Sequence, residues 1–211
     1  PLLLPTALLL PPAELLNNTL SSIQSRILHV SCFYFSLFRR PPARCPNNMT
    51  HPDLYAQLRL FLDGNEITEP SPDLLTDQRR RFASSPDIVL QPRSVESVQS
   101  IMRFCFKHKI PVTPQGGNTG LCGAAVAENG VLLNLSKLNR IREINLADNS
   151  ITVEAGVILQ NVQKAAAEAG RLFPLSLASE GSCEIGGNIA CNAGGLNVLR
   201  YGSMRDLVLG L

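Results

Sequence analysis

The chain has 211 residues, which is enough for one domain of ordinary size together with a tail. Hydrophobic residues make up 45% of it and charged residues 17%, a balance that excludes an intrinsically disordered chain. The net charge of +2 gives no electrostatic reason to expect nucleic-acid binding, and no apolar run reaches the roughly 20 residues that a membrane-spanning helix needs.

Residues 1–48 differ in composition from the rest of the chain. Prolines interrupt their short leucine runs, so no stable helix is expected there. No acidic residue falls between Glu14 and Asp53, and four arginines are scattered through 1–48, which is typical of a mitochondrial transit peptide. The alternative that we favour is upstream sequence joined to a true start at Met49, which would leave the protein in the cytoplasm. Under either interpretation, 1–48 is predicted to be a tail outside the fold.

The six cysteines form no CxxC pair and no regular framework. A chain of this length can bury a core without disulfides, so reduced thiols in an intracellular compartment fit better than secretion. Cys122, Cys183 and Cys191 lack the tight spacing and the neighbouring histidine of a metal centre. We therefore predict no metal site in this chain.

Globular patterning begins directly after the tail. Apolar residues at helical spacing predict a helix from Pro52 to about Leu62, and Ser71 opens a second short helix. Residues 49–85 are therefore expected to form a helical segment that precedes the main domain. The three consecutive arginines at 79–81 are interpreted as a solvated face of this segment.

Residues 86–211 show the pattern of an α+β fold. The first elements form a β–α–β unit that consists of a buried strand at 88–90, a helix capped by Ser94 and a strand at 111–114. The elements predicted after this unit are, in order, strands at 131–135 and 151–154 and a helix at about 158–169 that ends at Gly170. We expect a small sheet with flanking helices over 86–155 and the opening of a second subdomain over 156–211.

Nine of the fifteen glycines fall in two short stretches, four at 116–123 and five at 181–195. Glycine costs conformational entropy, so such density favours backbone that approaches a large ligand and offers N–H groups to phosphate. No helical pattern opens directly after the first loop, which argues against a dinucleotide fold in which a helix N-terminus holds the pyrophosphate. Taken alone, one such loop is more often a structural turn, but two in succession favour an extended cofactor.

The sequence of these loops resembles that of a known family. The segments PQGGNTG at 114–120 and GSCEIGGN at 181–188, followed by NAGG at 192–195 and RYG at 200–202, resemble the FAD-linked oxidases of the vanillyl-alcohol-oxidase superfamily. Within it they look most like D-2-hydroxyglutarate dehydrogenases and the FAD subunit of glycolate oxidase, with D-lactate dehydrogenases close by. The resemblance implies that 86–211 is an FAD-binding domain of the PCMH type, built from two α+β subdomains and truncated in the second.

In that family the first loop lies along the FAD pyrophosphate and the second continues toward the ribose and flavin. The resemblance therefore implies cofactor contacts from Pro114, Gln115, Gly116, Gly117, Asn118, Thr119, Gly120, Leu121, Ala178, Ser179, Gly181, Ser182, Cys183, Gly186, Gly187, Asn188, Ala190, Asn192, Tyr201 and Gly202. Relatives that attach FAD covalently often carry a histidine in the first loop. Asn118 stands there instead, which favours noncovalent FAD.

The resemblance implies an FAD-dependent dehydrogenase of 2-hydroxy acids, such as D-2-hydroxyglutarate, glycolate or D-lactate, in which hydride passes to flavin N5. The expected partners are the small-molecule acid and an electron acceptor. In the family, a C-terminal substrate domain supplies the arginine, the histidines and any divalent metal, so the catalytic residues of this chain are unknown. His108, the sole histidine in 86–211, is expected only to complement a helix dipole. The alternatives are an inactive FAD-binding fragment and a flavoenzyme of the same superfamily that acts on another alcohol.

Overall fold

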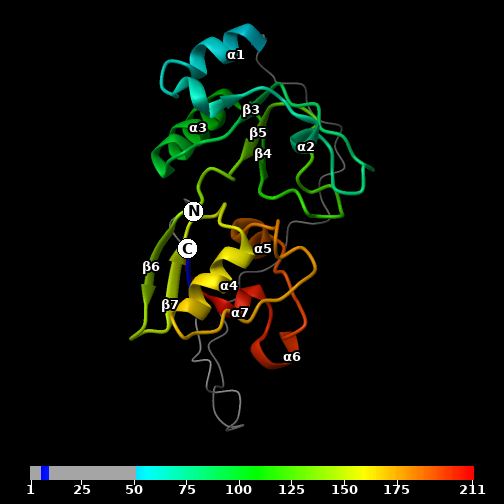
Figure 1. The fold of residues 1–211 in the computed structure, drawn as a ribbon. Coiled ribbons are helices and arrows are strands. Elements are labelled where there is room, and N and C mark those ends of the chain that lie inside the picture. The colour runs from blue at the N-terminus through cyan, green and yellow to red at the C-terminus, as the bar shows by residue number, and fades with distance from the viewer. Residues whose placement is uncertain (1–5, 10–50) are drawn as a thin grey trace.

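The computed structural model describes residues 6–9 and 51–211, which form two halves, each built on a four-stranded sheet (Figure 1). The sheet of the first half has the order β2 (Ile67–Thr68), β3 (Ile88–Leu90), β5 (Val131–Asn134) and β4 (Val112–Gln115). Strands β3, β5 and β4 are parallel, and β2 is antiparallel to β3. The parallel strands place their carboxyl ends at one edge, where the first glycine loop begins.

Helices cover both faces of the first sheet. Helices α1 (His51–Leu58) and α3 (Val95–His108) lie on one face, where Leu58, Leu90 and Ile101 are fully buried in a common core. Because successive strand residues point to opposite faces, Val89 instead packs on the other side, against α2 (Pro72–Leu75). A short 3₁₀ turn, η2 (Gly64–Glu66), leads into β2. The first half therefore has the layered α+β architecture that the sequence predicts.

The second half is an antiparallel sheet with four helices. The strand order is β6 (Ile141–Asn145), β7 (Ser150–Val153), β1 (Thr6–Leu9) and β8 (Val208–Gly210). The helices are α4 (Leu159–Glu168), α5 (Ile185–Ala190), α6 (Val198–Tyr201) and α7 (Met204–Leu207). Their shared core includes Ile151, Leu159, Ile185 and Met204, all fully buried.

Residues Thr6–Leu9 pair with β7 on one side and with β8 on the other. This differs from the expectation that 1–48 lies outside the fold. The physical reason is that the edges of β7 and β8 offer backbone groups that a short apolar segment can pair with. The rest of the predicted tail lies outside the described residues.

The predicted elements over 88–170 are confirmed with small shifts of their ends. Ser94 caps α3, since its Oγ accepts a hydrogen bond of 3.0 Å from the Ser97 N–H. The boundary between the subdomains is different, because β6 and β7 belong to the second sheet rather than to the first. Strand β6 was not predicted, since a register irregularity between Ile141 and Glu143 breaks its alternation. Helix α5, inside the second glycine loop, was also not predicted.

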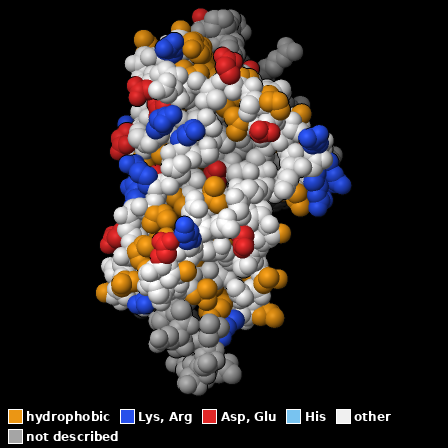
Figure 2. All heavy atoms as spheres, in the orientation of Figure 1, with side chains coloured by type: hydrophobic (Ala, Val, Ile, Leu, Met, Phe, Trp, Pro, Cys, Tyr) orange, Lys and Arg blue, Asp and Glu red, His pale blue; other side chains and the backbone are white. Residues whose placement is uncertain are grey.

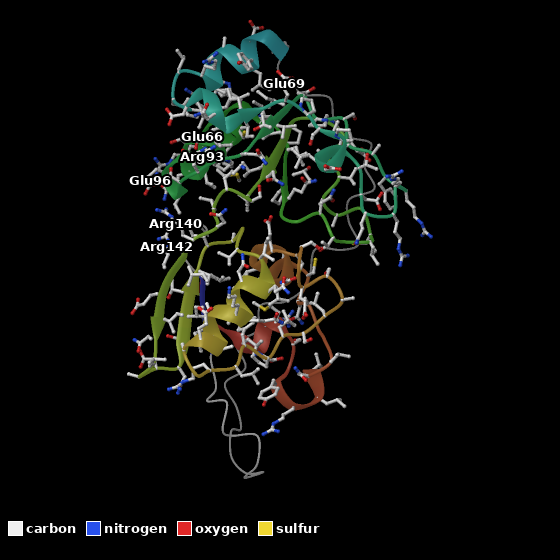
Figure 3. The ribbon with its side chains drawn as sticks, in the orientation of Figure 1. Glu66, Glu69, Arg93, Glu96, Arg140 and Arg142 are labelled. Carbon is white, nitrogen blue, oxygen red and sulfur yellow. The ribbon has the colours of Figure 1, made fainter. Side chains whose placement is uncertain are left out.

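A buried carboxylate fixes the segment that joins the two halves. Glu154 is 3% exposed in its side chain, and its Oε1 lies 2.9 Å from a guanidinium nitrogen of both Arg140 and Arg142. Burial alone would raise the pKa of Glu154, but the hydrogen bonds from these arginines outweigh it and hold that pKa below its usual value. Figure 3 shows both arginines at this junction, near Glu96 of α3, whose charge also acts on Arg140. No helix among the described residues has the length and apolarity needed to cross a membrane.

Candidate cofactor-binding site

The first glycine loop follows β4 and is held at its base by the side chain of Gln115, which is 2% exposed. The Gln115 amide donates hydrogen bonds to the carbonyl oxygens of Leu74 (2.9 Å) and Ala125 (3.2 Å), on either side of the loop. Its Oε1 accepts a hydrogen bond of 3.1 Å from Asn134 on β5. The side chain that we predicted as a cofactor contact is therefore engaged within the protein.

This hydrogen bond is one rung of an amide network that crosses the first sheet. Asn134 also donates to the carbonyl of Gly116 (3.3 Å), and its Oδ1 accepts from Gln91, the residue after β3 (3.0 Å). Gln91 in turn accepts from Thr68 on β2 (3.1 Å). A buried polar network whose members are all paired is rigid. This network therefore holds the start of the loop in place.

Asn118 ties the tip of the first loop to α2 and to the residue that follows it. Its backbone is left-handed, with φ of 51°, and its amide donates to the carbonyls of Thr76 (2.8 Å) and Asp73 (3.2 Å). Asparagine adopts this conformation more readily than most residues, because its short polar side chain can hydrogen-bond locally. Asn118 therefore shapes one wall of the cleft described below.

The two glycine loops are in direct contact. A Cβ atom at Gly117 would collide with the carbonyl oxygen of Ser182, so this position has to be glycine for the loops to meet. A Cβ atom at Gly116 would lie 3.1 Å from Oε2 of Glu184, which comes from the second loop. The structure thus brings together the two motifs that the sequence singled out.

The second loop is anchored on the core of the second half. Cys183 is buried, and its carbonyl accepts a hydrogen bond of 3.0 Å from Leu159 at the start of α4. Asn188 is also buried, with its amide 3.5 Å from the Cys183 sulfur. A Cβ atom at Gly186 would lie 2.9 Å from that of Ala155. These three predicted contact residues position the loop rather than expose their side chains.

A cleft of about 610 Å³ opens beside the contact between the loops. It is lined by Pro72, Asp73, Thr76, Asp77, Gln78, Arg80, Gly117, Asn118, Thr119 and Ser182. Four of the predicted cofactor residues are in this lining, and they come from both loops. Within the described part of the chain, no backbone N–H of residues 116–122 donates to a protein acceptor. Such N–H groups beside a cleft are suited to phosphate oxygens.

The segment after α2 adds charge to this cleft. The carboxylate of Asp77 is buried and accepts hydrogen bonds from the backbone N–H groups of Phe82 (2.7 Å), Arg81 (2.6 Å) and Arg79 (3.1 Å). The bond from Phe82 contributes most to holding the pKa of Asp77 below its usual value. The arginines at 79–81 are exposed, and Figure 2 shows basic side chains gathered on the edge beyond α2. Arg80 lines the cleft. The interpretation of residues 79–81 as a solvated face did not predict this position.

Glu184 is a second residue of the site that sequence reasoning did not single out. It is 6% exposed, and its Oε2 is buried without a hydrogen-bond partner in the described structure. Burial raises the pKa of its carboxyl group to about 7. A glutamate among glycines and serines carries no sequence signal of burial, because the burial arises only when the two loops meet.

The remaining predicted contacts lie elsewhere. Asn192, Tyr201 and Gly202 are not part of the cleft lining. Asn192 caps α7, since its Oδ1 accepts from the Ser203 hydroxyl (2.9 Å) and the Arg205 N–H (2.8 Å). Across residues 51–211, no three histidine, cysteine, aspartate or glutamate side chains are grouped so as to hold a metal ion.

Comparison with known proteins agrees with this geometry. The family described as FAD binding domain matches residues 86–211, which include both glycine loops and every predicted contact residue. The chain therefore belongs to the FAD binding domain family. This confirms the resemblance to FAD-linked oxidases drawn from the loop sequences.

Within the family, the chain resembles D-2-hydroxyglutarate dehydrogenases. The protein of that name from Xanthomonas citri pv. viticola is 47% identical over 136 residues, which are 64% of this chain and 29% of the relative. "D-2-hydroxyglutarate dehydrogenase, mitochondrial" from Danio rerio is 40% identical over 176 residues, which are 81% of this chain and 32% of the relative. The chain thus spans about a third of the length of these relatives.

Solved structures share the fold at low sequence identity. An alkyldihydroxyacetonephosphate synthase has a TM-score of 0.66 at 17% identity, over 74% of this chain and 31% of its own. The 6-hydroxy-D-nicotine oxidase of Arthrobacter nicotinovorans has a TM-score of 0.57 at 22% identity, over 67% of this chain and 31% of its own. Both likenesses support the α+β fold described above.

Proposed function

We propose that this chain binds FAD noncovalently in the cleft beside the two glycine loops, as the cofactor-binding part of a dehydrogenase of 2-hydroxy acids. The observation that carries the proposal is the contact between the loops at Gly117 and Ser182, which both line the cleft. Bound FAD would supply the chemistry, since its flavin accepts a hydride from the substrate carbon. The residues of this chain would bind and orient it.

The charges and donors of the cleft suit the pyrophosphate of FAD. The N–H groups of residues 116–122 are free of protein acceptors in the described structure, and Arg80 adds a positive charge to the lining. Of the two carboxylates in the lining, that of Asp73 is exposed to solvent, and that of Asp77 is buried and accepts from three backbone N–H groups. These features support a site for two negatively charged phosphates.

D-2-hydroxyglutarate is the substrate that we propose first, because relatives from a bacterium and a fish carry its name. Glycolate and D-lactate follow. The electron acceptor and the cytoplasmic location are likewise proposals, with mitochondria as the alternative because the Danio rerio relative is named mitochondrial.

The proposal is tested by titrating the 211-residue chain with FAD and following the flavin fluorescence. Riboflavin, which lacks the pyrophosphate and the adenosine, is the matched control ligand. We expect FAD to bind with a stoichiometry of one and riboflavin to bind far more weakly. Acid or heat should then release all of the flavin. Absence of FAD binding would contradict the proposal, and flavin that stays on the denatured chain would contradict noncovalent attachment.

A further inference from the structure

Glu184 stands at the point where the two glycine loops meet, yet neither the fold nor the lining of the cleft uses its carboxyl group. Its Oε2 is buried and unpartnered among the described residues, and it faces the α-carbon of Gly116, where an added Cβ would come within 3.1 Å. Leaving a buried polar atom unpaired destabilises the folded protein, so such a group calls for an explanation. The carboxyl therefore lies against the backbone of the first loop, which the proposed function assigns to the cofactor.

We propose that Glu184 is a further cofactor-binding residue, and that its carboxyl group, in the neutral form, donates a hydrogen bond to a phosphate oxygen of the bound dinucleotide. This inference rests on the proposed function, because it requires FAD to occupy the first glycine loop. An ionised carboxylate would repel phosphate, whereas the neutral carboxyl group proposed here donates a hydrogen bond to it.

The surroundings of Glu184 favour the neutral form. Burial is the cause that raises its pKa to about 7, and no cation contributes. The first loop presents no titratable side chain to it between Gly116 and Gly120. The segment after β7 is hydrogen-bonded to Ile185 and Gly186 and carries Glu154, which is paired with arginines. The loop of Glu184 itself carries Glu180, which accepts from Gln163 and Ser176.

Across the cleft, the charged groups are Asp73, Asp77 and Arg80. A phosphate beside Glu184 would add negative charge and raise the carboxyl pKa further, because like charges disfavour ionisation. A neutral carboxyl offers a proton to a phosphate oxygen, whereas a carboxylate offers only repulsion. The bound state would therefore hold a proton that the free protein begins to lose near pH 7.

This coupling gives FAD affinity a defined pH dependence. Below the pKa of the free protein, Glu184 is protonated before and after binding, so affinity is flat. Above it, binding has to take up one proton, and affinity falls by up to about tenfold per pH unit. FAD binding to the wild-type chain should therefore weaken by about 10-fold or more between about pH 6.5 and about pH 8.5.

The test is a set of FAD titrations over that pH range at constant ionic strength. Glu184→Gln keeps a donor of nearly the same shape but does not titrate, so its affinity should stay flat and exceed that of the wild type at the highest pH. Glu168→Gln, in an exposed side chain of α4, is the matched control and should follow the wild type. Thermal melts of the free proteins verify that each variant is folded.

A decline of equal slope in Glu184→Gln and in the wild type would overturn the inference, as would an affinity that rises with pH, which would show that a carboxylate accepts from a hydroxyl. Both results would leave FAD binding itself in place. A wild-type chain that binds no FAD even at the lowest pH would instead overturn the proposed function and the inference together.

Discussion

In the first glycine loop, a Cβ atom at Gly117 would collide with the backbone of Ser182, whereas in the second loop a Cβ atom at Gly187 would meet no heavy atom within 4 Å. Gly117 is explained by the packing of the protein alone. Gly187 lies in the exposed part of α5, where glycine is unfavourable compared with alanine by about 1 kcal/mol. Both loops are rich in glycine, yet their glycines meet different requirements.

The comparison separates glycines that the packing of the protein requires from glycines that it does not require. Gly195 resembles Gly117, because a Cβ atom there would collide with the carbonyl oxygen of Ser176. Gly120 resembles Gly187, since nothing lies within 4 Å of its added Cβ. Glycines of the second kind are not required by the protein itself, so a ligand that approaches the backbone closely is the reason that we propose for them.

The largest effect is expected from Gly117→Ala. The added methyl group would have to displace the backbone of Ser182 and separate the loops, at a cost of about 2–4 kcal/mol. The free protein should therefore melt about 5–15 °C lower, at about 2–4 °C per kcal/mol. The measurement is thermal unfolding by circular dichroism without FAD. An unchanged melting temperature would mean that the loops do not touch as described.

A smaller effect on affinity alone is expected from Arg80→Ala. Arg80 lines the cleft, whereas the neighbouring Arg79 is exposed outside its lining and serves as the matched control. Loss of one charge–phosphate contact should weaken FAD binding by about 5–10-fold, and the difference should shrink at high salt because exposed charges are screened. Equal losses in Arg79→Ala and Arg80→Ala would point to the overall charge of the segment rather than to a contact in the cleft.

Much of the fold could be predicted from the sequence, since local rules decide it. Ser94 and the apolar face of α3 determine that helix, and Gly170, with φ of 68°, ends the segment after α4 as expected. Strand β6 escaped prediction because its bulge breaks the alternation of apolar residues. The pairing of Thr6–Leu9 with β7 and β8 escaped because it depends on open strand edges far away in the sequence.

The site was predictable as two motifs but not residue by residue. Composition identifies a glycine-rich loop, yet it does not distinguish Gly117 from Gly187, because the difference lies in what stands opposite each one. Gln115 and Cys183 belong to the motifs, but their side chains are buried and support the loops from the protein interior. Glu184 was overlooked for the same reason, since its burial appears only in the assembled structure.

The central claim, that the glycine loops serve FAD, is tested most directly by Gly187→Ala. The free variant should be as stable as the wild type or more stable by about 0.5–1 kcal/mol, because alanine is the better helix former and the space around the added methyl group is open. Its FAD affinity, measured by fluorescence titration on the same samples, should fall by about tenfold or more. A variant that is stable and binds FAD as tightly as the wild type would contradict the claim for the second loop.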